Sequence, residues 1–141
     1  MRTFTGFILF TIFLILSLIH FYWALGGTRG TVAAVPTNHD NKKVISPGPL
    51  ECFAVALILL AFATFSLIKI KVVLFHLPGW LFNYGFWIIA ALFFLRAIGD
   101  FKYVGVFKKV NTTKFGKMDT KYYSPLCLLI AVLGIILELL H

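Results

Sequence analysis

Four long apolar runs, separated by polar connections, constrain this chain more than any other feature. The runs cover residues 4–25, 50–68, 79–99 and 125–140, and the connections cover 26–49, 69–78 and 100–124. Each run is about long enough to cross a hydrocarbon core of roughly 30 Å as a helix, and the fourth is the shortest. Backbone groups in lipid must bond within their own segment, and the sequence lacks the alternation of polar and apolar residues that a barrel needs. We therefore predict an all-α fold, a four-helix transmembrane bundle that forms one integral membrane domain over residues 1–141.

The amino-acid composition agrees with a protein whose outer surface faces lipid. Of the 141 residues, 60% are hydrophobic and only 13% are charged, whereas about a quarter of a soluble domain is charged. The formal net charge of +8 lies mostly in the connections. It favours contact with anionic lipid headgroups over nucleic acid, because no soluble basic domain exists to bind nucleic acid. Two cysteines, Cys52 and Cys127, are too few for a disulfide framework and are expected to be small buried hydrophobes.

The ends of the apolar runs carry signals for the start and stop of helices. Gly26-Gly27 is predicted to stop the first helix, and the first run is expected to be retained as a span because it is long for a signal peptide. The Pro47-Gly48-Pro49 segment is predicted to start the second helix, and Ser124-Pro125 is predicted to supply the N-cap and first residue of the last. These signals favour helices that begin and end close to the limits of the runs.

Basic residues are divided unevenly between the two membrane faces. Connections 26–49 and 100–124 share one face and hold most of the Lys and Arg, while the other face holds Arg2, Lys69 and Lys71. The positive-inside rule therefore predicts that connections 26–49 and 100–124 of this multi-pass cell-membrane protein are cytoplasmic.

Arg96 and Asp100 form the least expected feature, because they lie one helical turn apart near the end of the third run. An ionisable residue at such a depth is costly unless it is paired or turned inward. The order Arg-to-Asp is the weaker orientation for a helix ion pair, and an acid near a helix C-terminus is disfavoured. Three interpretations stay open: Arg96 extends to the interface, Arg96 and Asp100 form a structural clasp, or the two residues bind a ligand.

Other polar side chains gather at the same membrane face, where a small bundle brings helix ends together. The candidate ligand-binding residues are His20, Trp23, Arg96, Asp100, Tyr103 and Asp119. A structural alternative exists for His20 as an interface residue bonded to a carbonyl, and for Trp23 as an interfacial aromatic. We expect five members of this set to converge on one site just below the membrane surface, namely His20, Arg96, Asp100, Tyr103 and Asp119.

No catalytic motif accompanies these residues. The sequence contains no HExxH, no GxSxG and no phosphate-binding Gly-rich loop, and its four His lack metal-ligand spacing. Neither a cofactor nor a metal is therefore expected.

Three functions remain as hypotheses. The first is binding of a lipid or small amphiphile, with its anionic or polar head on Arg96 and His20 and its tail between helices. The second is a membrane-embedded enzyme acting on a lipid-soluble substrate, with His20 or Asp100 as acid or base and Arg96 stabilising negative charge. The third is a small proton-coupled transporter or an accessory subunit, which would favour a homodimer or a membrane-protein partner.

Several segments together resemble a known but uncharacterised family of small bacterial four-span membrane proteins. They are His20-Phe-Tyr-Trp-Ala-Leu-Gly-Gly27, Pro36, Pro47-Gly-Pro49, Leu95-Arg-Ala-Ile-Gly-Asp-Phe-Lys-Tyr-Val-Gly-Val-Phe-Lys-Lys109, Asp119-Thr120 and Tyr123-Ser-Pro-Leu-Cys127. Thr28-Arg29-Gly30 stands where members usually carry a Gly-Trp-Gly-like turn. The family is known only as a domain of unknown function. The resemblance therefore implies a four-span fold in a bacterial inner membrane, without an activity.

Overall fold

All regular secondary structure is helical in the part of the chain that the computed structural model describes, which is residues 1–29, 35, 38, 40, 42, 48–99, 109 and 113–140. The elements are α1 (Arg2–Ala24), α3 (Pro49–Lys69), α4 (Gly79–Ile98), α5 (Lys114–Met118), the π-helix η1 (Asp119–Tyr123) and α6 (Ser124–Leu139). Four helical stretches are long and apolar enough to cross a membrane: α1, α3, α4 and the stretch Phe115–Leu139. The predicted all-α, four-helix transmembrane fold is confirmed.

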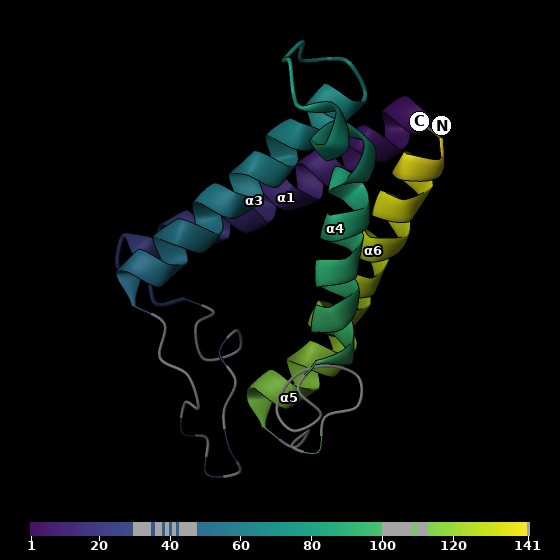
Figure 1. The fold of residues 1–141 in the computed structure, drawn as a ribbon. Helices are drawn as coiled ribbons and strands as arrows, with labels where there is room; N and C mark the ends of the chain where they lie inside the picture. The colour runs from purple at the N-terminus through teal and green to yellow at the C-terminus, as the bar shows by residue number, and fades with distance from the viewer. Residues whose placement is uncertain are drawn as a thin grey trace.

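The four long helices form two antiparallel pairs that diverge from one another like the arms of a V (Figure 1). α1 packs on α3, α4 packs on α6, and a smaller contact between α1 and α6 joins the pairs. We call the closed end of the V the apex. It contains the start of α1, the end of α3, the start of α4 and the end of α6 (Figure 1). The arms separate toward the opposite face, where α1 and α4 end and α3 begins (Figure 1).

Local sequence explains where α3 begins and ends. Gly48 is the N-cap and Pro49 the first helical residue, as predicted, because the missing N–H of proline has no intrahelical partner at that position anyway. Glu51 lies in the first turn, where its charge interacts favourably with the helix dipole. At the other end Lys71 adopts φ 62°, and the amide of Val72 donates to the carbonyl of Leu67 at 3.0 Å. This left-handed residue ends α3 in the manner usually assigned to glycine.

Buried side chains and an interhelical hydrogen bond hold α1 against α3, and a glycine lets α6 pack closely on α4. Leu9 and Phe13 of α1 are fully buried, and the Ser17 hydroxyl donates to the carbonyl of Ala56 in α3 at 2.7 Å. In the other pair Phe86 of α4 packs at Gly134 of α6. The outward faces of all four helices carry many exposed large hydrophobic side chains. Such faces are stable in lipid, which agrees with a membrane location.

The last helical stretch begins earlier than the sequence indicated. Helix starts at Lys114, and the backbone passes through η1 into α6 without leaving helical dihedral angles at Tyr123 (φ −73°, ψ −47°). The N-cap of α6 is therefore Tyr123, and the predicted N-cap role of Ser124 is wrong. Pro125 does lie in the first turn, as predicted. The wider π turn before it accommodates a ring that would crowd the preceding carbonyl of a regular α-helix.

Candidate functional site

Arg96 is paired with a buried carboxylate from the opposite helix of its pair. Nη2 of Arg96 on α4 donates to Oδ1 of Asp119 on η1 at 3.2 Å. The Asp119 side chain is fully buried, whereas the Arg96 side chain is 36% exposed. A charged hydrogen bond compensates part of the cost of burying Asp119. The pair links the end of α4 to the start of the last helical stretch.

Two buried polar atoms, one in this ion pair and one five residues after Asp119, have no hydrogen-bond partner in the described part of the chain. They are Nη1 of Arg96 and Oγ of Ser124. The π-helical hydrogen bond from the Ser124 amide to the Asp119 carbonyl places Ser124 on the Asp119 face of the stretch. A buried polar group without a partner costs about 1–3 kcal/mol. An acceptor that satisfied both donors, such as an anionic oxygen, would therefore bind favourably. We call Arg96, Asp119 and Ser124 the Arg96 site.

His20 and Trp23 form a separate pair on α1. Their ring centroids are 5.1 Å apart with an interplanar angle of 68°. Nδ1 of His20 is 2.7 Å from the carbonyl oxygen of Leu16, and the indole N–H of Trp23 donates to the carbonyl of Arg29 at 2.9 Å. Both side chains thus have local backbone partners, which fits the structural alternative of interface residues.

The structure does not bring the His20–Trp23 pair and the Arg96–Asp119 pair into one site. The C-terminal ends of α1 and α4 lie at the ends of different arms of the V (Figure 1). The expected convergence of His20 with Arg96 is therefore not seen, because it assumed four parallel helix ends in close contact. Arg96 and Asp119 do meet as expected. Asp100 and Tyr103 lie outside the described residues. Whether any of the six candidates binds a ligand stays a prediction.

A second buried ion pair, which the sequence analysis missed, joins the two helix pairs at the apex. Nζ of Lys69, the last residue of α3, is 2.8 Å from Oε1 of Glu138 on α6, and the two side chains are 0% and 5% exposed. Nζ of Lys69 also donates to the backbone carbonyl of Phe82 on α4 and lies 4.5 Å from the centroid of the Phe82 ring. Lys69 was assigned to the basic 69–78 connection, and that placement is wrong. The sequence did contain a signal for this ion pair, because Lys69 and Glu138 are opposite charges on two otherwise apolar segments, near the same membrane face.

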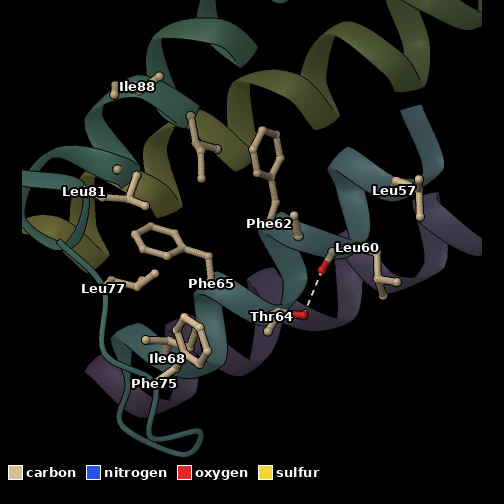
Figure 2. A pocket seen from close by; sticks show the side chains of 13 residues that line it. Leu57, Leu60, Phe62, Thr64, Phe65, Ile68, Phe75, Leu77, Leu81 and Ile88 are labelled. Carbon is tan, nitrogen blue, oxygen red and sulfur yellow. Dashed lines mark hydrogen bonds between the residues drawn. The ribbon is translucent and has the colours of Figure 1, made fainter. Parts of the chain in front are cut away.

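An apolar groove of about 600 Å³ lies between α3 and α4 on the inner side of the V (Figure 2). Its lining residues are Leu57, Leu60, Ala61, Phe62, Thr64, Phe65, Ile68, Phe75, Leu77, Leu81, Gly85, Ile88 and Ile89. Its volume is within the range of about 300–1,000 Å³ that ligand pockets occupy. Thr64 is the one hydroxyl-bearing residue in this set, and its hydroxyl donates to the carbonyl of Leu60 at 3.0 Å. The groove therefore presents a hydrocarbon surface.

Among the described residues, no group of three or more His, Cys, Asp or Glu is placed to hold a metal ion. Cys52 and Cys127 are both free and buried, as expected for small hydrophobes.

Comparison with known proteins identifies a family whose description names no activity. A family model with the description "Protein of unknown function (DUF3995)" matches residues 13–134. The chain has no significant match among curated proteins or among solved structures.

Proposed function

We propose that this chain, which belongs to the family described as "Protein of unknown function (DUF3995)", binds a membrane amphiphile with an anionic head. The head accepts hydrogen bonds at the Arg96 site, and the apolar tail lies between the two helix pairs. The observation that carries this proposal is the pair of buried donors, Nη1 of Arg96 and Oγ of Ser124, which lack acceptors in the described part of the chain.

The depth of the Arg96 site suits a lipid-type head. Arg96 lies two residues before the end of α4, which is 20 residues long and therefore spans about 30 Å. The guanidinium is consequently close to one membrane face, at the level where lipid headgroups begin. The Arg96 side chain is 36% exposed although Nη1 is buried, so a head that approaches from outside the protein reaches Nη1 when neighbouring side chains move aside. Leu92, one turn before Arg96, and its neighbour Leu95 are both more than half exposed and present an apolar route from the surrounding lipid.

Charge at the same membrane face supports an anionic head. Lys109, Lys117 and Lys121 are exposed near the Arg96 site, on the chain segment that leads into α6. Juxtamembrane basic residues attract anionic headgroups, at about 1 kcal/mol for each Lys near the surface. Asp119 is already paired with Nη2 of Arg96, which leaves Nη1 for a ligand. A carboxylate and a phosphate are both anions that can accept a hydrogen bond from Nη1.

Native mass spectrometry on the protein purified in a mild detergent tests the proposal. Wild type is compared with Arg96→Gln and with Lys117→Gln, a control that removes an exposed positive charge from the same face. Hexadecyl phosphate and palmitate are the added probes. We expect wild type to retain an anionic amphiphile and Lys117→Gln to bind it at most about fivefold more weakly, because one Lys near the surface contributes about 1 kcal/mol. Arg96→Gln should bind it about 10- to 100-fold more weakly, since a charged hydrogen bond contributes about 1.5–3 kcal/mol.

The two probes distinguish the head groups, because retention of one over the other identifies phosphate or carboxylate as the preferred anion. If no variant binds either probe and Arg96→Gln only loses stability, the Arg96–Asp119 pair is a structural clasp and the proposal is wrong.

A further inference from the structure

We infer that the groove between α3 and α4 receives the end of an aliphatic chain longer than the acyl chain of one bilayer leaflet. This inference rests on the proposed function and adds the class of tail to it. It follows from the register between the Arg96 site and the groove along α4, from the lengths involved, and from the connection that lines the groove at the apex.

Arg96 lies on the face of α4 that lines the groove. Eleven residues separate Arg96 from Gly85, which corresponds to three turns plus about 20°. Seven residues separate it from Ile89, which is two turns less about 20°. Gly85 and Ile89 both line the groove. A chain that starts at the guanidinium and follows α4 toward the apex therefore enters the groove without crossing to another face of the helix.

The distances along α4 set the length of the chain. At 1.5 Å per residue, Arg96 is about 10 Å from Ile89, about 16 Å from Gly85 and about 22 Å from Leu81. One leaflet of a 30 Å hydrocarbon core is about 15 Å thick. An acyl chain of one leaflet consequently reaches Gly85, at the near part of the groove. Only a longer chain fills the part lined by Leu81, Phe75 and Leu77.

The groove extends along α4 from the Arg96 side to the apex. The 70–78 connection joins α3 to α4 at the apex, and Phe75 and Leu77 from this connection line the groove (Figure 2). The arms of the V separate in the opposite direction (Figure 1). Phe65 on the α3 wall stacks on Phe86 of α4 with ring centroids 5.1 Å apart, so the walls meet behind the groove. A tail therefore enters between the arms and ends at the apex.

Binding of alkyl phosphates of increasing length tests this inference. Dodecyl, hexadecyl and docosyl phosphate are titrated into wild type, Ala61→Trp and Ala91→Trp in the same detergent. Ala61 is exposed and lines the groove, so a Trp there fills it; Ala91 is exposed on α4 and does not line it. Partitioning into micelles rises with chain length equally for all three proteins, so the ratio of variant to wild-type affinity isolates the groove.

We expect Ala61→Trp to bind dodecyl phosphate, whose chain reaches no farther than Gly85, less than about threefold more weakly than wild type, and docosyl phosphate about tenfold more weakly, a loss of about 1.4 kcal/mol. Ala91→Trp should match wild type for all three probes. If Ala61→Trp binds docosyl phosphate as tightly as wild type, the inference is wrong, while Arg96-dependent binding of the short probe leaves the proposed function intact. Binding of all probes that does not depend on Arg96 would instead overturn the proposed function.

Discussion

The Lys69–Glu138 ion pair makes a quantitative prediction about how the two helix pairs are held together. Lys69→Met removes the positive charge and leaves Glu138, which is 5% exposed, buried without its partner. It also removes the donor to the Phe82 carbonyl. Glu138 must then take up a proton or remain a charge in an apolar environment, and both outcomes destabilise the folded protein.

The magnitude follows from the burial of both side chains. Removing one partner of a buried pair costs about 3–5 kcal/mol, whereas replacing both partners by apolar residues of similar volume is often neutral or stabilising. Lys69→Met should therefore lower the free energy of unfolding by about 3–5 kcal/mol. The double variant Lys69→Met/Glu138→Met should recover most of that loss.

Reversible unfolding in mixed micelles, followed by tryptophan fluorescence, measures these differences. Lys71→Met is the control, since Lys71 is exposed and lies two residues farther along the chain. Its free energy of unfolding should change by less than about 0.5 kcal/mol, as is usual for surface substitutions. The reasoning is refuted if Lys69→Met costs less than about 1 kcal/mol, or if the double variant is as unstable as the single one.

Three further substitutions test local features of the fold, each by the same unfolding measurement. Lys71→Gly should raise the free energy of unfolding by about 1 kcal/mol, because the left-handed conformation at φ 62° is unfavourable for lysine and not for glycine; no gain would show that the turn is unstrained. Ser17→Ala should cost about 0.6–2 kcal/mol by removing the buried bond to the Ala56 carbonyl, and an unchanged value would contradict that bond. Gly85→Leu should cost about 1–3 kcal/mol, because a Cβ at Gly85 overlaps the Phe65 ring; a neutral result would mean that this ring moves freely.

The helices themselves were predictable from the sequence, because the length of an apolar run and the requirement for internal backbone hydrogen bonds leave few alternatives in lipid. The start of α3 was also predictable, because proline is favoured at the first position of a helix and Pro49 follows Gly48 there. The early start of the last stretch was not foreseen. The segment from Lys114 to Tyr123 is polar, and hydropathy marks the end of a span rather than the end of a helix.

The divergence of the two helix pairs could not be predicted, since it depends on side-chain packing such as that of Phe65 against Gly85. The candidate site was predicted in part. Polar character alone placed Arg96 and Asp119 in one cluster, and the structure pairs them. The same reasoning added His20, whose helix belongs to the other arm. Lys69 and Glu138 were missed because each charge, taken alone, resembles an ordinary residue at the end of a span.

The most direct test of the central claim is the affinity of the purified protein for hexadecyl phosphate in wild type and in Ser124→Ala. The Ser124 hydroxyl is buried and has no hydrogen-bond partner in the described part of the chain, so its removal should leave the free energy of unfolding unchanged or slightly raised. If this hydroxyl binds the anionic head, the affinity should fall about tenfold, since a hydrogen bond to a charged group contributes about 1.5–3 kcal/mol. Equal affinity in the two proteins would contradict the claim that the Arg96 site holds the head of an amphiphile.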